Sequence, residues 1–135
     1  MNNFDWDKKY DVGVKLFDEQ HKQLLTALND IYKAMQNKDD KLALAQIINN
    51  LRQYAQEHLS VEEACLLENS YPEYEEHVKQ HKIFKEKLAG FCDDFNSDKF
   101  LLHFELAVFL KNWIVNHIMM VDRKYTDFLN SKGIY

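Results

Sequence analysis

The sequence predicts an all-α protein, an up-down-up-down bundle of four helices, and three observations support this. Glycine and proline are scarce, with 3 and 1 residues among 135, which leaves little material for the tight turns of a β-sandwich or barrel. Apolar residues recur at spacings of three and four along four segments. Only short polar stretches separate these segments. The length predicts a single domain over 1–135, with an N-terminal arm at 1–17 and, at 18–135, the bundle and the C-terminal extension of its last helix.

The arm is rich in aromatic residues but has neither helical nor strand periodicity. Residues such as Phe4 and Trp6 are unusual in a solvated tail, so we expect the arm to lie against the domain. The first helix is predicted over 18–36, with Asp18 as its N-cap. Its apolar stripe comprises Leu24, Leu25, Leu28, Ile31, Tyr32 and Met35.

The second and third helices follow the polar stretch 37–40. The second is predicted over 41–68, and its stripe includes Ile47, Leu51, Tyr54, Val61 and Cys65. Pro72 fits the first turn of the third helix, which runs to about Asp94, because proline lacks only an N–H group that the first turn does not use. The stripe of this third helix includes His77, His81, Phe84, Leu88 and Phe91.

The fourth helix begins after a polar turn at 96–98, with Ser97 or Asp98 as its cap, and continues towards Leu129. Its apolar stripe includes Leu102, Leu106, Phe109, Leu110, Trp113 and Ile114. Four amphipathic helices joined by short connections favour antiparallel neighbours, which completes the predicted bundle.

Charge and composition exclude several classes of protein. With 17 basic and 22 acidic residues the net charge is −5, which argues against binding to nucleic acid. The N-terminus does not resemble a signal peptide, and the longest uncharged apolar stretch, 112–121, falls short of the ~20 residues of a membrane span. We therefore expect a cytoplasmic protein that binds neither nucleic acid nor membrane. Cys65 and Cys92 form no Cys-x-x-Cys motif, and an offset of ~25 Å along the bundle excludes a disulfide between them.

Five of the six histidines fall at one height of the predicted bundle. Counting residues from the turns, at ~1.5 Å per residue, places them and a glutamate within a few ångströms of one layer. Two pairs of these residues are four apart on one helix, so each pair shares a face. Ionisable groups on core stripes are costly unless they are paired or bind a metal. The layer contains His21, His58, Glu62, His77, His81 and His117.

These residues predict more than one metal ion. Five imidazoles and a carboxylate exceed the four ligands of a tetrahedral zinc, and nitrogen and oxygen ligands without thiolate suit iron, manganese or zinc. The Glu-x-x-His motif of ferritin-like di-iron bundles is absent from this chain. His103 lies about 21 Å from His117 along the axis, so we predict no ligand role for it.

Several short motifs occur in a fixed order along almost the whole chain. They are Trp6-x-x-x-Tyr10-x-Val12-Gly13, Asp18-Glu19-Gln20-His21, His58-x-x-x-Glu62-Glu63, Tyr71-Pro72, His77-x-x-x-His81-x-x-Phe84 and Trp113-x-x-x-His117-Ile118-x-x-x-Asp122-x-x-Tyr125. Together, in this order, they resemble the hemerythrin family, specifically its single-domain bacterial members.

The resemblance implies a non-haem di-iron centre that binds dioxygen reversibly, for oxygen storage, delivery or sensing. It implies two iron ions with an oxo or hydroxo bridge. The implied ligands are His77, His81 and His117 on one iron, His21 and His58 on the other, which keeps an open coordination site, and Glu62 and Asp122 as bridges. Small anions such as azide are further expected ligands of the open iron, and Glu63 or backbone carbonyls are candidates to orient the imidazoles.

An apolar oxygen pocket is also implied by the resemblance. Its residues are Leu24, Leu59, Trp113, Ile114 and Ile118. Leu59 departs from the phenylalanine that commonly follows this histidine, and its smaller side chain widens the pocket. We assign no catalytic residue, because no proton donor is predicted to face the pocket, and this favours a binding protein over an enzyme. The alternatives are a di-iron enzyme of the same fold, such as an oxidase, a peroxidase or a nitric oxide detoxifying protein, and a structural or zinc-loaded bundle.

The spacing of His117 and Asp122 predicts a local irregularity in the last helix. Residues five apart on a regular α-helix point about 140° away from each other, so both cannot face one centre. A π-turn would place them on one face, and otherwise the helix must tilt or end there. The intervening residues 118–121 contain no glycine or proline, so packing and the metal must hold the distortion.

Overall fold

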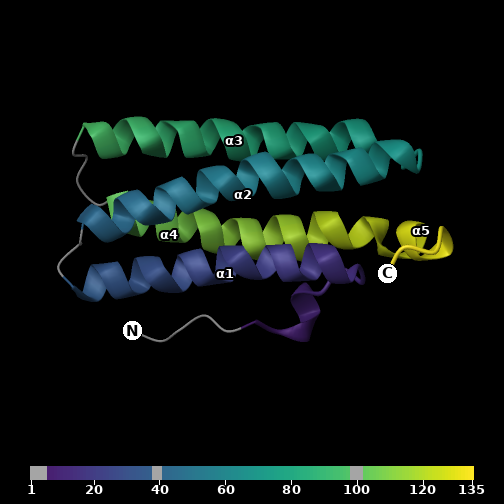
Figure 1. The fold of residues 1–135 in the computed structure, drawn as a ribbon, viewed down its shortest axis with the longest axis horizontal. Helices are drawn as coiled ribbons and strands as arrows, with labels where there is room; N and C mark the ends of the chain where they lie inside the picture. Colours follow the sequence, from purple (N-terminus) through teal and green to yellow (C-terminus); the bar gives the residue numbers. More distant parts are fainter. Residues whose placement is uncertain (1–5, 38–40, 98–101) are drawn as a thin grey trace.

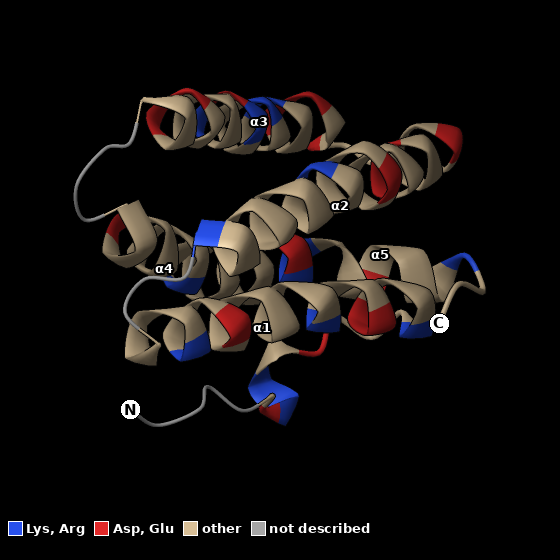
Figure 2. Cartoon of the chain, turned by 60° about the vertical axis from the view of Figure 1, so that its left-hand side comes forward, with Lys and Arg blue, Asp and Glu red and all other residues tan. Residues whose placement is uncertain are grey.

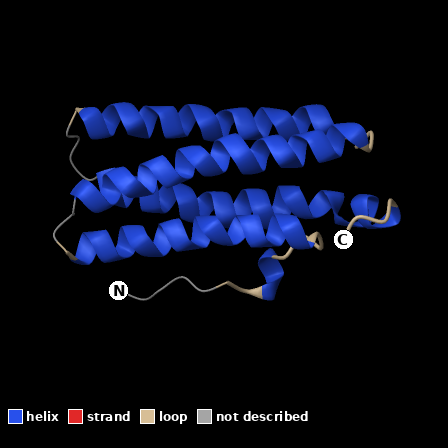
Figure 3. Ribbon diagram, viewed as in Figure 1, coloured by secondary structure: helices blue, strands red, loops and turns tan. Residues whose placement is uncertain are grey.

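The computed structural model describes residues 6–37, 41–97 and 102–135, and every regular element in these ranges is helical (Figure 3). Successive helices run in opposite directions and lie side by side, which confirms the predicted four-helix bundle (Figure 1). The first three helices are α1 (Lys15–Gln36), α2 (Lys41–Glu68) and α3 (Tyr74–Asn96). The last helical segment comprises α4 (Leu102–Asn112), the π-helix η2 (Trp113–Val121), the 3₁₀-helix η3 (Asp122–Tyr125) and α5 (Thr126–Ser131), and a further 3₁₀-helix, η1 (Lys8–Tyr10), lies in the arm.

Helix α1 begins three residues earlier than predicted, and Asp18 is not its N-cap. The cap position is Val14, whose side chain makes no capping hydrogen bond. Asp18 lies in the first turn, and its Oδ1 accepts a hydrogen bond from the backbone N–H of Val12 at 2.6 Å. The carboxylate therefore satisfies a backbone donor of the arm instead of one in the helix.

The bounds of α2 are as predicted, and those of α3 differ slightly. The chain turns at Ser70, whose φ of 59° lies in the left-handed region, and the N–H of Tyr71 donates to the carbonyl of Leu66 at 2.9 Å, which ends α2. Pro72 precedes α3 instead of lying in its first turn. At the other end Ser97 is the C-cap of α3, and so does not cap the fourth helix.

Two predicted turns fall partly outside the described residues. Positions 38–40 of the first turn and Asp98 of the last turn belong to the ranges that are not described.

Apolar side chains from all four helical segments fill the interior. Fully buried examples are Phe17, Leu28, Leu51, Phe84, Leu106, Leu110 and Ile114. The apolar core surrounds one layer of buried histidines and carboxylates, which lies in the half of the bundle nearer the turn between α2 and α3. Acidic and basic residues are interspersed along α1 and α3 instead of forming a patch of one sign (Figure 2).

The last helical segment, 102–131, is long enough to cross a membrane and contains an 18-residue window with a mean hydropathy of 1.2, of which 39% is buried inside the bundle. The core helix of a globular bundle passes the same test. This segment contributes the buried His117 and Asp122 to the interior, as a core helix does.

The arm lies against the domain, as the sequence predicts for residues 6–17; Phe4 is outside the described residues. Val12 is buried, and its carbonyl accepts a hydrogen bond from Oγ1 of Thr126 at 2.6 Å. Nη1 of Arg123 donates to the carbonyl of Lys9 at 3.2 Å. Through these two hydrogen bonds the arm contacts Arg123 and Thr126, which follow Asp122 in the last helical segment.

Replacing Gly13 by alanine is expected to destabilise the protein. Gly13 has a φ of 76°, and a Cβ atom there would lie 2.7 Å from Cγ2 of Thr126. A side chain at this position would therefore strain the backbone and clash with Thr126. We expect the free energy of unfolding to fall by about 1–3 kcal/mol in urea denaturation. Gly90→Ala is the matched control, because no atom lies within 4 Å of the added Cβ in α3, and it should gain about 0.5–1 kcal/mol. Equal stability of the two variants would contradict this account of the arm.

Candidate metal centre

The seven residues predicted as ligands come together in one buried layer. They are His21 from α1, His58 and Glu62 from α2, His77 and His81 from α3, His117 from η2 and Asp122 from η3. None has an exposed fraction above 4%. On α2 and α3 the spacing of four residues places both members of each pair on the face that points into the bundle.

The π-helix explains how the last helical segment supplies two ligands. Its nine residues end where the N–H of Asp122 donates to the carbonyl of His117, five residues earlier. Both side chains then face the interior, with His117 Nε2 3.0 Å from Asp122 Oδ1. The predicted irregularity is confirmed in its π-turn form, and the segment between the two residues contains neither glycine nor proline.

Glu62 lies at the middle of the layer and contacts imidazoles on both sides. Its Oε1 is 2.6 Å from Nε2 of His77 and 3.0 Å from Nε2 of His81. Its Oε2 is 3.3 Å from Nε2 of His58 and 3.5 Å from Nε2 of His21. One carboxylate therefore faces two separate sets of imidazoles, as a bridging ligand must.

Asp122 occupies an equivalent position. Its Oδ1 is 3.0 Å from Nε2 of His77, and its Oδ2 is 3.3 Å from Nε2 of His21. Two groups of side chains bring one ligand atom each to within 4.8 Å of one another. The larger group is Glu62, His77, His81, His117 and Asp122, and the smaller is His21, His58 and Glu62.

Most of these short contacts are not hydrogen bonds, which indicates that the cluster fits metal ions. Within the described residues, Nε2 of four histidines is buried and makes no hydrogen bond, although each lies within 3.5 Å of a carboxylate oxygen. These histidines are His21, His58, His81 and His117. An unsatisfied buried polar atom costs about 1–3 kcal/mol, and metal coordination removes that cost. Nitrogen and oxygen donors in this number suit two ions of the iron, manganese or zinc type.

Charge in the cluster is arranged for cations. Burial lowers the pKa of His77, but the nearby carboxylates of Asp122 and Glu62 outweigh burial and raise this pKa to about 10. The same balance raises the pKa of His21 to about 9. Burial raises the pKa of Glu62, yet the surrounding imidazoles hold it well below its usual range. The carboxylates therefore favour protonation of His21 and His77, and a metal ion would displace these protons on binding.

Outer hydrogen bonds orient two of the imidazoles. Nδ1 of His81 donates to Oε2 of Glu63 at 2.8 Å, which is the contact expected of a residue that orients this imidazole. Nδ1 of His58 contacts Oε1 of Gln20. Each contact places the proton on Nδ1 and leaves Nε2 to face the carboxylates. Sequence reasoning missed Gln20, although it lies beside His21 in the motif that marks the first ligand.

Tyr125 is a further neighbour of the centre that sequence reasoning gave no role. It is fully buried, and its hydroxyl donates to Oε2 of Glu62 at 2.9 Å. Burial and the charge of Glu62 raise the pKa of this phenol well above its usual value. Tyr125 follows Asp122 by three residues, so one turn of the chain carries both.

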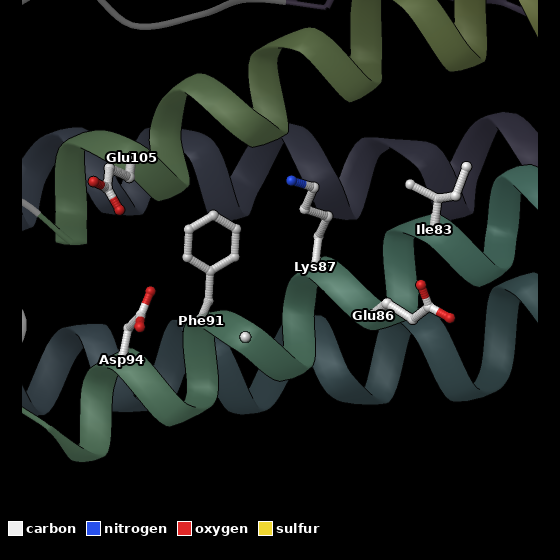
Figure 4. A pocket seen from close by; sticks show the side chains of 7 residues that line it. Ile83, Glu86, Lys87, Phe91, Asp94 and Glu105 are labelled. Atoms are coloured by element: carbon white, nitrogen blue, oxygen red, sulfur yellow. The ribbon is translucent and has the colours of Figure 1, made fainter.

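The five residues predicted to form an oxygen pocket are all buried, with exposed fractions of 8% or less. Trp113 stacks on His117, with ring centroids 3.8 Å apart and ring planes 10° apart. Beyond Trp113, a series of aromatic rings leads through Phe84 and Phe109 to Phe91. Phe91 lies in a groove of about 420 Å³ between α3 and α4 (Figure 4). The role of these residues in binding dioxygen stays a prediction.

Other candidate residues take no part in the cluster. His103 is buried in α4 but belongs to neither group of potential ligands. Cys65 and Cys92 are free thiols, which confirms that they do not form a disulfide.

Comparison with known proteins identifies relatives that match nearly the whole chain. A family model described as "Hemerythrin HHE cation binding domain" matches residues 12–129. A bacteriohemerythrin of Clostridium acetobutylicum is 30% identical over 130 residues, which cover 92% of this chain and 99% of the relative. A myohemerythrin of Theromyzon tessulatum is 27% identical, with 90% of each chain covered.

A crystal structure of a hemerythrin point mutant superposes with a TM-score of 0.85 over 94% of this chain and 97% of that chain. At 21% sequence identity this likeness shows the fold alone.

Proposed function

Because the chain belongs to the hemerythrin family, we propose that it binds dioxygen reversibly at a non-haem di-iron centre and serves in oxygen storage, delivery or sensing. The observation that carries this proposal is the asymmetry of the buried cluster. One group offers five ligand atoms and the other only three, with Glu62 common to both. An open coordination position distinguishes a reactive metal site from a structural one.

We assign the ligands as the motifs predict. In this assignment three imidazoles, those of His77, His81 and His117, hold the fully coordinated iron. Two imidazoles, those of His21 and His58, hold the iron that accepts dioxygen. Glu62 and Asp122 bridge the ions and offset their positive charge, as the short distances from both carboxylates to imidazoles of the two sets support. When bound, two ferrous ions supply the binding position and the electrons that dioxygen binding requires.

The remaining residues of the site hold and shield the centre. Glu63 and Gln20 fix the orientation of His81 and His58. In this proposal the apolar side chains Leu24, Leu59, Trp113, Ile114 and Ile118 form the pocket for dioxygen, from which water and protons are excluded. An apolar pocket of this kind favours release of dioxygen unchanged over its further reduction, so we propose a carrier and assign no catalytic residue. Azide and similar small anions should compete for the open position, and a cytoplasmic location stays a prediction.

Iron content and oxygen uptake test this proposal. We expect anaerobic reconstitution with ferrous iron to give about two irons per chain, as five imidazoles and two bridging carboxylates require. Titration with dioxygen should saturate at one dioxygen for each pair of irons. A protein that retains only a single zinc ion, or that consumes dioxygen continuously, would contradict the proposal.

Replacing Glu63 by alanine is expected to weaken iron binding. The change removes the acceptor that orients the ring of His81, and loss of such partners typically costs about 10–100-fold in metal affinity. Glu57→Ala is the control, because Glu57 is an exposed carboxylate on the same helix. Competition with a chelator measures the affinity, and equal values for the two variants would show that Glu63 does not support the site.

Replacing Leu59 by phenylalanine is expected to slow autoxidation of the oxygenated protein. Leu59 is buried next to His58, and a larger ring in the proposed pocket should exclude water and anions from the open iron. The measurement is the decay of the oxygenated spectrum in both proteins, with and without azide. Equal or faster decay in the variant would mean that Leu59 does not loosen the pocket.

A further inference from the structure

A groove between α2 and α3 carries only positive charge, although the chain as a whole has a net charge of −5. Its volume is about 340 Å³, and its charged lining residues are Arg52 and Lys85. We propose that this groove binds small organic acids, with the carboxylate between Arg52 and Lys85 and the apolar part of the molecule on the floor of the groove. The groove is separate from the metal centre, so this proposal goes beyond the proposed function and does not depend on it.

Small side chains on two neighbouring helices leave the space for the groove. Helices α2 and α3 lie side by side (Figure 1), and Ala55 of the first and Ala89 of the second both line the groove. Its most buried lining residues are Ala55 and Leu88, with exposed fractions of 6% and 3%, and they form an apolar floor. Ligand pockets have volumes of about 300–1,000 Å³, so this groove suits a small molecule.

Two cationic side chains, one from each helix, line this floor. Arg52 belongs to α2 and Lys85 to α3, and both are exposed. Among the residues that the structure describes, neither is part of an ion pair, so both are available to a ligand. A guanidinium offers two parallel donors to a carboxylate, and an ammonium group adds a third.

The nearby carboxylate of Glu63 does not occupy this position. Glu63 interacts electrostatically with Lys85, but it does not line the groove. Its Oε2 accepts the hydrogen bond from Nδ1 of His81, so this carboxylate is directed towards the metal centre. No carboxylate in the lining of the groove offsets the two cations.

Other grooves in the described part of the chain differ in charge. The groove between α3 and α4 contains Glu86, Asp94 and Glu105 with one lysine (Figure 4). The depression at the turn between α2 and α3 contains three glutamates with one lysine. The groove between α1 and α2 contains Asp30 and Glu57 without any cation. The groove with Arg52 and Lys85 is therefore suited to anions, whereas these three favour cations.

The combination of charge and apolar surface defines the class of ligand. An inorganic anion would contact the two cations but leave the apolar floor exposed to water. A neutral apolar molecule would cover the floor but leave the cations without a partner. A carboxylic acid with a short hydrocarbon chain or a single ring satisfies both parts of the groove at once.

Cys92 provides a direct readout, because this free thiol lines the groove. Cys65 is also a free thiol but does not line the groove, so it serves as an internal control. Iron-loaded protein is alkylated with neutral iodoacetamide, with and without octanoate or phenylpropanoate, and each cysteine is followed by peptide mass spectrometry. At an acid concentration ten times its Kd, we expect alkylation of Cys92 to slow by about tenfold and that of Cys65 to stay unchanged.

Variants at exposed positions test which features hold the acid. Arg52→Gln and Lys85→Gln should each weaken the protection of Cys92 by about three- to fivefold in apparent Kd. Ala89→Leu fills the groove without a change of charge and should abolish protection. Lys82→Gln is the matched control, because Lys82 is an exposed lysine of α3 outside the groove, and this variant should bind the acid as the wild type does.

Two further ligands and azide complete the test. Acetate lacks the apolar part and protonated octylamine has the opposite charge, so neither should protect Cys92. Azide competes for the open iron and should leave the protection by octanoate unchanged. No protection by either acid, equal protection by octanoate and octylamine, equal affinities in Arg52→Gln and Lys82→Gln, or loss of protection in azide would overturn the proposal. Failure to bind two irons or dioxygen would instead contradict only the proposed function.

Discussion

Replacing Glu62 by alanine should abolish iron binding at both positions. Glu62 is the only residue shared by the two groups of potential ligands within the described chain, and its oxygens lie within 3.5 Å of four imidazoles. Its loss removes one bridging ligand from each ion and the negative charge that offsets them. Metal analysis after reconstitution should therefore find almost no iron, with helix content preserved in circular dichroism.

The control for this variant is Glu68→Ala, at the C-terminal end of the same helix and outside both groups. It should retain about two irons per chain, as the wild type does. Retention of either iron at wild-type affinity in Glu62→Ala would contradict the assignment of Glu62 as a bridge.

Replacing His58 by alanine should remove mainly the iron that binds dioxygen. In the proposed assignment this iron has only two imidazoles, so the loss of one leaves His21 and the shared carboxylates. The other iron keeps three imidazoles. We expect about one iron per chain and loss of the oxygenated spectrum, since each missing ligand weakens metal binding steeply.

His103→Ala is the control for a buried histidine outside the cluster, and it should keep both irons. If His58→Ala retains two irons and an unchanged oxygenated spectrum, the division of the ligands between the two ions is wrong.

The sequence predicts most of this centre because its ligands follow helical geometry. The pairs on α2 and α3 are four residues apart, and residue counts from the turns give the common height of the four helices. The same geometry predicts a local irregularity, of which a π-turn is one form, because His117 and Asp122 cannot share a face of an α-helix. Without the family resemblance, however, Asp122 reads as a surface residue, since no periodic pattern places position 122 inside.

The details that the sequence does not predict depend on contacts between distant segments. The contact of Gln20 with His58 joins α1 to α2, and the hydrogen bond of Tyr125 to Glu62 joins η3 to α2. Neither pair has a characteristic spacing along the chain. For Asp18 the sequence pattern gives a wrong prediction, because an acidic residue before an apolar stripe is typical of an N-cap. Here the helix begins three residues earlier, and the carboxylate accepts a hydrogen bond from the backbone of the arm instead.

The visible spectrum of the reduced, iron-loaded protein tests the central claim most directly. Reduced protein is exposed to air, degassed and exposed again, while the absorption of the iron centre is followed. The di-iron carrier proposed here predicts a band that appears in air, bleaches on degassing and returns on the second exposure. Immediate conversion to a ferric product that degassing does not reverse, or no iron band at all, would contradict it.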